Sequence, residues 1–150
     1  MNILFVCTGN TCRSPMAEAF AKDIFVKNDM DAYIFSRGIN VNYSKPITGE
    51  VAVTMLEYGL DTITHRSIQV TKDDIKKSDI VLAMSIEHKR YILSIFPEAN
   101  NKVYTLKEYA KNDKNDLDVV DPYGYGISVY KECAVEIKKY VEIVVDKLTK

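Results

Sequence analysis

The sequence predicts an α/β fold in which helices cover both faces of a single, mainly parallel sheet of four strands. Apolar runs of four to six residues, rich in β-branched side chains, alternate with segments in which apolar positions recur every three or four residues. This alternation is typical of right-handed β-α-β crossovers, whose ligands bind at the carboxyl ends of the strands. The 150 residues show no repeat or linker, so we expect one domain over residues 1–150.

The first strand and helix are the most clearly marked elements. The run Asn2–Val6, NILFV, is apolar without interruption, as expected for a strand that is covered on both faces. Ser14 is a suitable cap, and Pro15 a suitable first residue, for a helix that continues to about Lys27. Its predicted buried face repeats every four residues and consists of Met16, Phe20 and Ile24.

Further strands and helices alternate along the middle of the chain. A strand is expected over Tyr33–Ser36, ended by Gly38. A helix is expected over Thr48–Tyr58, and Gly59 terminates it.

The second half continues the same order. A short polar helix over Lys72–Lys77 leads to a buried strand over Asp79–Met84, then to a helix of about residues 86–96 and a fourth strand over Lys102–Leu106. A polar run, Lys111–Asp118, follows. The chain closes on a helix whose buried face is formed by Tyr130, Cys133, Ile137, Val141, Val144 and Leu148.

The composition excludes several functional classes. A formal net charge of −1 gives no bulk attraction to nucleic acid or to an anionic membrane, so neither is expected as a partner. No secretory signal or bilayer-spanning stretch is evident and three cysteines cannot all pair, so we expect a cytoplasmic protein with reduced thiols. His65 and His88 are far from each other and from any cysteine pair. We expect no structural metal site and interpret both as surface or local hydrogen-bonding residues.

The stretch Cys7–Pro15, CTGNTCRSP, carries the chemistry. Cys7 follows the first strand, where doubly wound sheets bind ligands, and Arg13 lies where the next helix begins. Between them, the backbone of Thr8–Cys12 can wrap with its N–H groups inward, and Gly9 permits a turn closed to a side chain. Amide groups, a helix dipole and a guanidinium bind oxyanions and favour a thiolate over a thiol. The pattern predicts a cysteine nucleophile beside an anion site.

A nucleophilic cysteine of this kind needs an acid for the departing group, and Asp121 in DPYGYG is the candidate. Pro122 stiffens this stretch, and Gly124 and Gly126 would let it approach another loop closely. A carboxyl group beside a bound oxyanion keeps its proton more readily than one in water, so it could protonate the leaving atom and later accept a proton from water. Asp118 is a weaker candidate because no proline follows it.

Together these residues resemble a known signature. Cys7–Pro15 is similar to the CX5R(S/T) motif of the low-molecular-weight protein-tyrosine-phosphatase family, and Asp121-Pro122 resembles its general-acid loop. The resemblance covers essentially the whole chain. It implies a flavodoxin-like architecture, no cofactor, phosphorylated proteins as substrates, and phosphate or a similar oxyanion in the loop. It also implies that Cys7 is the nucleophile, Arg13 the phosphate clamp and Asp121 the acid and base.

The same resemblance assigns supporting roles. Asn10 braces the loop through its side chain, Ser14 interacts with the thiolate, and Tyr123 lines the substrate cleft. The residues placed around the substrate or its phosphate are Thr8, Gly9, Asn10, Thr11, Cys12, Ser14 and Tyr123.

One branch of the family is more similar in detail. CTGNTCRSPMAE, DIVLAM and KVYTLKEY look like the bacterial protein-arginine phosphatases, and Thr11 stands where tyrosine-directed members usually carry an aliphatic residue. Tyr125 departs from that branch, because a second glycine is expected there and a wider aromatic wall suits a phenyl ring. The other matches, Thr11 among them, still favour phosphoarginine as the substrate, with phosphotyrosine as the alternative.

Other interpretations are weaker. Arsenate reductases share the Cys-Arg loop but need further cysteines near the end of the third strand, where this chain has LAMSIEHKR. A phosphoresidue-binding module has no use for a nucleophile and an acid, and a nucleotide-binding regulator would carry Gly-Lys-Ser/Thr or GxGxxG. Cys12 is either loop packing or the partner of Cys7 in a reversible disulfide, whereas Cys133 is expected in the core.

Overall fold

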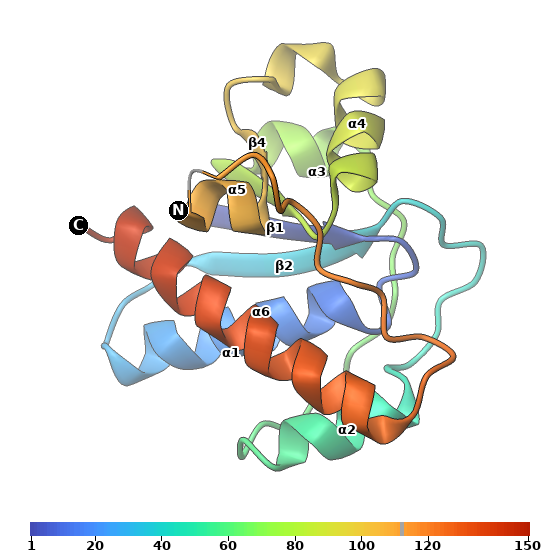
Figure 1. Cartoon of the computed structure of the whole chain (residues 1–150). Coiled ribbons are helices and arrows are strands. Elements are labelled where there is room, and N and C mark those ends of the chain that lie inside the picture. Colours follow the sequence, from blue (N-terminus) through green and yellow to red (C-terminus); the bar gives the residue numbers. More distant parts are fainter. Residues whose placement is uncertain (112) are drawn as a thin grey trace.

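The computed structural model describes residues 1–111 and 113–150, which form a four-stranded sheet (Figure 1). The strands are β1 (Asn2–Cys7), β2 (Tyr33–Gly38), β3 (Ile80–Ala83) and β4 (Val103–Thr105). All pairs are parallel, in the order β2-β1-β3-β4, so the chain reverses its winding direction next to β1. The predicted α/β class and the four-stranded parallel sheet are confirmed.

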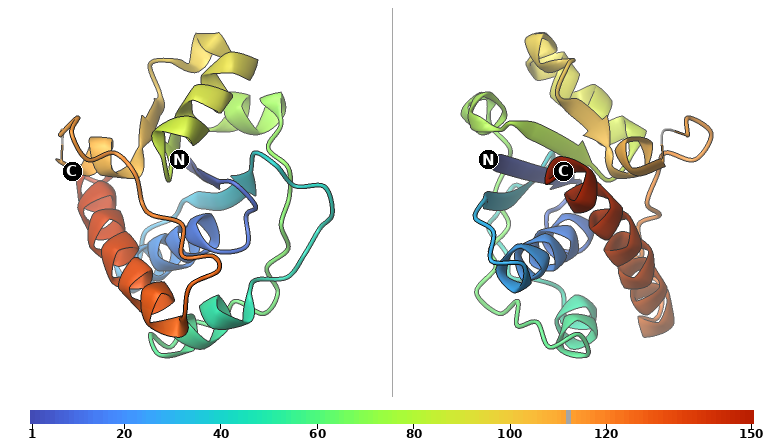
Figure 2. Two further views of the ribbon diagram at one scale, coloured as in Figure 1. Left: turned by 45° about the vertical axis from the view of Figure 1, so that its right-hand side comes forward. Right: turned by 90° about the vertical axis from the view of Figure 1, so that its left-hand side faces the viewer.

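Helices cover both faces of this sheet, as predicted. They are α1 (Arg13–Lys27), α2 (Gly49–Leu56), α3 (Lys72–Lys77), α4 (Ile86–Ile95), the 3-10 helix η1 (Pro97–Ala99), α5 (Leu106–Lys111) and α6 (Ile127–Leu148). α1 and α6 pack together on one face, with α2 and α5 against α6, while α3 and α4 lie on the other face (Figure 2). Among the described helices, none has both the length and the apolar character needed to cross a bilayer.

The residues of β1 alternate between two cores. Ile3, Phe5 and Cys7 lie in the larger core, which α1 and α6 complete, whereas Leu4 and Val6 lie in the smaller core with α3 and α4. All five are buried, as expected for a central strand of a parallel sheet. The last residue of β1 therefore brings a thiol to the carboxyl edge of the sheet, on the side of α1.

The start of α1 differs from the prediction. The helix begins at Arg13, and Cys12 occupies the cap position without a hydrogen bond from its side chain to the N–H groups of the helix. Ser14 is not the cap but the second helical residue, because its buried hydroxyl bonds to groups of the preceding loop. Pro15 is the third helical residue rather than the first, which is tolerated because N–H groups in the first turn have no helical partner.

The helix α5 is absent from the sequence prediction. The strand expected over Lys102–Leu106 ends at Thr105, and a helix begins there instead. Thr105 Oγ1 accepts from the N–H of Glu108 at 3.0 Å, while Glu108 Oε2 accepts from the N–H of Thr105 at 2.9 Å. This Thr-x-x-Glu capping box is the overlooked signal. The polar run predicted over Lys111–Asp118 includes residue 112, which lies outside the described residues.

Candidate active site

The predicted loop, Thr8–Cys12, connects β1 to α1 at the carboxyl edge of the sheet. Cys7 lies at its start with only 2% of its surface exposed, and its Sγ is 2.9 Å from Oγ of Ser14. Because the hydroxyl can donate to sulfur, the pair has the geometry of a nucleophile and the group that stabilises its charge.

Asn10 holds the loop in shape. Its Nδ2 donates to Oγ of Ser14 and to Oγ of Ser36, each at 2.9 Å. Its Oδ1 accepts from the backbone N–H of Ile68 at 3.0 Å. The side chain therefore ties the loop to the first turn of α1, to β2 and to the segment before α3.

The expectation for Gly9 is wrong. A Cβ at Gly9 would meet nothing closer than Oγ1 of Thr11, at 3.8 Å, and its φ is not left-handed. The left-handed residue is Asn10, with φ of 57°. Asparagine is one of the few non-glycine residues that enter this region, and its three side-chain hydrogen bonds offset the cost.

A close approach to the loop occurs instead at Gly38. A Cβ there would lie 2.6 Å from the carbonyl O of Thr8 and 2.6 Å from Cγ2 of Val41. The bare backbone lets the chain after β2 bind the loop, where the N–H of Asn40 donates to the carbonyl O of Thr8 at 3.0 Å. The sequence marks Gly38 only as the end of a strand.

The backbone of the loop offers free donors. In the part of the chain that the structure describes, no acceptor takes the N–H groups of residues 9–14. The last two belong to the first turn of α1, a helix of 15 residues whose dipole favours negative charge at this end. Unbonded N–H groups beside a helix N-terminus are suited to holding the oxygens of a phosphoryl group.

The guanidinium of Arg13 is held from two sides. Its Nη1 donates to the carbonyl O of Val119 at 2.9 Å. Its Nη2 lies 3.4 Å from Oγ1 of Thr8 and 3.6 Å from Oδ2 of Asp121. The structure therefore brings the predicted phosphate clamp and the predicted acid together, although they come from opposite ends of the chain.

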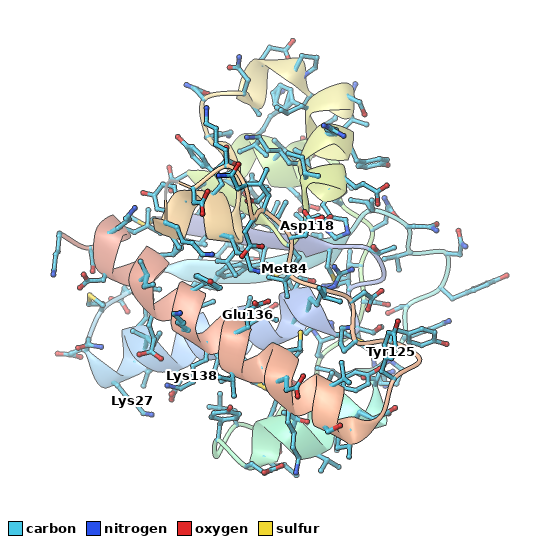
Figure 3. The ribbon with its side chains drawn as sticks, in the orientation of Figure 1. Lys27, Met84, Asp118, Tyr125, Glu136 and Lys138 are labelled. Carbon is cyan, nitrogen blue, oxygen red and sulfur yellow. The ribbon has the colours of Figure 1, made fainter. Side chains whose placement is uncertain are left out.

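The segment that carries Asp121 is fastened to the junction of β3 and α4. The backbone N–H of Ile86 donates to Oδ1 of Asp118 at 2.8 Å, and that of Val119 donates to the carbonyl O of Met84 at 2.7 Å. Met84 and Asp118 lie together in Figure 3. Asp118 is thus engaged at the start of α4, whereas 51% of the Asp121 side chain is exposed, which favours Asp121 as the acid.

The turn after Asp121 is exposed. A Cβ at Gly124 or Gly126 would meet nothing within 4 Å, so the predicted close approach of these glycines to another loop is wrong. Gly124 is needed for its φ of 87°, and Gly126 occupies the cap position of α6. Tyr123 and Tyr125 are both largely exposed and lie on the same turn as the acid.

The other two cysteines are less reactive by position. Burial raises the pKa of Cys12, and the hydroxyl groups of Thr48 and Thr11, 3.6 Å and 3.8 Å from its Sγ, only partly oppose this. Burial raises the pKa of Cys133 to about 12. Both are therefore thiols at neutral pH. Cys133 lies in the larger core, as predicted.

Both histidines reach the loop. Nε2 of His65 donates to the carbonyl O of Asn10 at 2.7 Å. His88, interpreted from the sequence as a surface or local residue, is 2% exposed, and its Nε2 is 2.8 Å from Oγ1 of Thr8. These contacts join residues 55 and 80 positions apart, so no spacing along the chain signals them.

Comparisons with known proteins find similar proteins over the whole length of the chain. A family model described as low molecular weight phosphotyrosine protein phosphatase matches residues 2–150. A protein-arginine-phosphatase of Bacillus subtilis (strain 168) is 36% identical over 150 residues, which cover 100% of this chain and 98% of the relative. The low molecular weight protein-tyrosine-phosphatase PtpB of Staphylococcus aureus is 38% identical over 148 residues, which cover 96% of this chain and 99% of the relative.

A solved structure has a similar backbone fold. The YwlE arginine phosphatase, in a C7S mutant with a phosphorylated active site serine, has a TM-score of 0.93 at 35% sequence identity. The match covers 100% of this chain and 97% of that chain.

Proposed function

The chain belongs to the low molecular weight phosphotyrosine protein phosphatase family, and on this premise we propose that it dephosphorylates proteins through a phosphocysteine at Cys7. The observation that carries the proposal is the buried Sγ of Cys7, 2.9 Å from Oγ of Ser14. Cys7 directly precedes the phosphate loop. The unbonded N–H groups of residues 9–14 belong to this loop and to the first turn of α1. A phosphoryl group held there lies beside the atom that attacks it.

In the first half-reaction, the thiolate of Cys7 attacks phosphorus in line with the bond to the leaving group. The S–P bond forms as the bond between phosphorus and the leaving nitrogen or oxygen breaks. The guanidinium of Arg13 and the loop N–H groups hold the phosphoryl oxygens as their charge shifts. The hydroxyl of Ser14 donates a hydrogen bond to the sulfur of Cys7. This bond stabilises the sulfur both when it attacks as the nucleophile and when it departs as the leaving group.

Asp121 handles the protons. Its carboxyl group protonates the leaving atom in the first half-reaction, and the resulting carboxylate accepts a proton from the water that attacks the phosphocysteine. The S–P bond then breaks, inorganic phosphate leaves and the thiolate returns. The exposed position of this carboxyl, 3.6 Å from Nη2 of Arg13, supports this role, because a protein substrate must bring its leaving group to the carboxyl from solvent.

Phosphoarginine is the favoured substrate. Thr11 supports this choice, because its half-buried side chain places a hydroxyl on the loop where tyrosine-directed relatives usually have an aliphatic group. That hydroxyl can help to orient the attacking water, and the size of the Thr11 side chain shapes the pocket. A protein-arginine-phosphatase that matches over the full length of the chain also supports it.

Phosphotyrosine is the second candidate. The largely exposed rings of Tyr123 and Tyr125 favour it, because aromatic side chains pack well against a phenyl ring. The similarity to a protein-tyrosine-phosphatase at 38% identity points the same way.

The cytoplasm is the proposed site of this reaction. All three cysteines are free thiols, and a phosphocysteine mechanism requires Cys7 to stay reduced. The partners are phosphorylated proteins, and inorganic phosphate is both the product and a ligand of the loop.

Replacing the nucleophile tests the mechanism. Cys7→Ser should abolish turnover of p-nitrophenyl phosphate, because an unactivated hydroxyl is a much weaker nucleophile than a thiolate. Its circular dichroism spectrum and thermal midpoint should match those of the wild type. Retained turnover would show that the nucleophile lies elsewhere.

A peptide pair tests the substrate. We expect a higher kcat/KM on a phosphoarginine peptide than on a phosphotyrosine peptide of the same flanking sequence. Thr11→Ile should shift this ratio towards tyrosine by about 10-fold, the order that one altered pocket contact produces. Thr11→Ser, which keeps the hydroxyl, is the matched control and should preserve the preference. A strong tyrosine preference that Thr11→Ile leaves unchanged would overturn the choice of phosphoarginine.

A further inference from the structure

A buried imidazole lies behind the phosphate loop and takes no part in the reaction above. His88, in the first turn of α4, has Nε2 2.8 Å from Oγ1 of Thr8 and Nδ1 2.9 Å from Oγ of Ser85. Ser85 also caps α4, since its Oγ accepts from the backbone N–H of His88 at 3.4 Å. The ring is therefore held at both of its nitrogens.

The junction of β3 and α4 reaches Arg13 by two routes. In one, the carbonyl O of Met84 accepts from the N–H of Val119, whose own carbonyl O accepts from Nη1 of Arg13. In the other, His88 contacts Thr8, whose Oγ1 is 3.4 Å from Nη2 of Arg13. The first route sets one edge of the guanidinium and the second sets the other.

One arrangement of protons lets each group of the second route donate to the next. Arg13 can only donate, so Oγ1 of Thr8 must offer it a lone pair. The single hydroxyl proton of Thr8 is then free to be donated to an unprotonated Nε2 of His88. Nδ1 carries the ring proton and donates to Ser85. In this series of hydrogen bonds, from Arg13 through Thr8 and His88 to Ser85, every donor points in the same direction, which strengthens each bond.

We propose that neutral His88 is a positioning residue for the phosphate clamp: it accepts the hydroxyl proton of Thr8 and so aims the Thr8 oxygen at Arg13. This inference rests on the proposed function, because a preset guanidinium matters only if the loop binds a phosphoryl group. With its plane held in this way, Arg13 can meet two phosphoryl oxygens without first reorganising.

The charges around the ring favour its neutral form. Burial, and then the positive charge of Arg13, lower the pKa of His88 to about 4, while the carboxylates of Asp118 and Asp121 act in the opposite direction. A protonated ring would donate at Nε2, compete with Arg13 for the lone pairs of Thr8 and add a second positive charge. A neutral ring with its proton on Nδ1 avoids all three effects.

A double-mutant cycle tests the route through Thr8. His88→Leu should lower kcat/KM on p-nitrophenyl phosphate and weaken inhibition by inorganic phosphate, on the order of 10-fold to 100-fold. His88→Gln, whose Oε1 can replace Nε2 as acceptor, should retain most of the activity. In a Thr8→Val background, His88→Leu should have little further effect, because both residues act through one contact. The same fold loss in both backgrounds would overturn the proposal.

A matched control separates positioning from damage to the helix. Ile92 lies one turn further along α4, fully buried in the smaller core and away from the loop. Ile92→Ala should lower the thermal midpoint and leave kcat/KM of the folded enzyme unchanged. A loss of kcat/KM equal to that of His88→Leu would show that any weakening of α4 disturbs the site and would overturn the role of His88.

A spectroscopic measurement decides the proton arrangement without turnover. Nitrogen-15 NMR of the wild-type imidazoles at pH 7 should show His88 protonated at Nδ1 and unprotonated at Nε2. A ring protonated at Nε2 would overturn the inference. A wild-type protein that hydrolyses no phosphorylated compound would instead overturn the proposed function, so the two failures are distinguishable.

Discussion

The phosphate loop and the segment that carries the acid meet at Arg13, but they are built in opposite ways. In and beside the loop, Cys7, Asn10 and Ser14 are almost wholly buried, and side-chain hydrogen bonds join Asn10 to three other parts of the chain. The acid segment is anchored by Val119, and beyond it most of the chain up to α6, including Asp121, is exposed, although Pro122 is buried.

This difference follows from what each region must do. The loop meets the same phosphoryl group in every substrate, so its geometry can be set before binding and supported by the core. The acid segment meets a leaving group and its protein surroundings, which vary. We therefore expect changes around the loop to alter both stability and activity, and changes at Asp121 to alter activity alone.

The largest expected effect on stability comes from the imidazole behind the loop. The pKa of His88 falls from 6.5 to about 4 on folding. Between these values the unfolded chain binds a proton that the folded chain does not, so stability is lost as the pH falls through this window and levels off below it. The loss amounts to about 3 kcal/mol.

Urea unfolding between pH 7 and pH 4 measures this effect. The wild type should lose stability steeply, whereas His88→Gln should lack the part of the slope that the imidazole contributes. Identical slopes for the two proteins would mean that His88 is not held neutral in the folded state.

The next effect concerns the close approach behind the loop. In Gly38→Ala, the new Cβ would lie 2.6 Å from the carbonyl O of Thr8, so the loop must move. Overpacking of this kind costs about 1–3 kcal/mol, and a displaced loop should lower kcat/KM on the order of 100-fold. Denaturant unfolding and kinetics on p-nitrophenyl phosphate measure the two losses.

Gly49→Ala is the matched control, because a Cβ at Gly49 meets nothing within 4 Å. It should leave activity unchanged and stability equal or slightly higher, since alanine favours the helix. If Gly38→Ala behaved like this control, the loop would not be held in the rigid way that distinguishes it from the acid segment.

The smallest effect on stability is expected at Asp121. Its side chain is half-exposed and its ion pair with Arg13 is long, so Asp121→Ala should change the free energy of unfolding by less than about 0.5 kcal/mol. Activity should fall more on phenyl phosphate than on p-nitrophenyl phosphate, because the poorer leaving group needs the proton more. Equal losses on both would remove the acid role, and a large loss of stability would erase the contrast with the loop.

Much of the fold was predictable because its signals are local. Apolar runs and helical periodicity locate most helices and strands to within one or two residues of their observed ends. The miss at α5 was also local, since the capping box of Thr105 and Glu108 is visible in TLKE. The misplaced cap at Ser14 has another cause: its hydroxyl bonds to Cys7 and Asn10 in three dimensions, which overrides its local preference as a cap.

The sequence by itself determined the α/β class and the relation between Cys7 and Arg13, because one strand, one short loop and one helix are enough to specify both. Only the tertiary structure decided how the loop is held: Gly38 against Thr8, His88 behind Thr8, and the carbonyl of Val119 on Arg13. The reason is that these contacts join segments up to 106 residues apart. Their pairing is set by which faces the two cores bury, and no spacing along the chain encodes that choice.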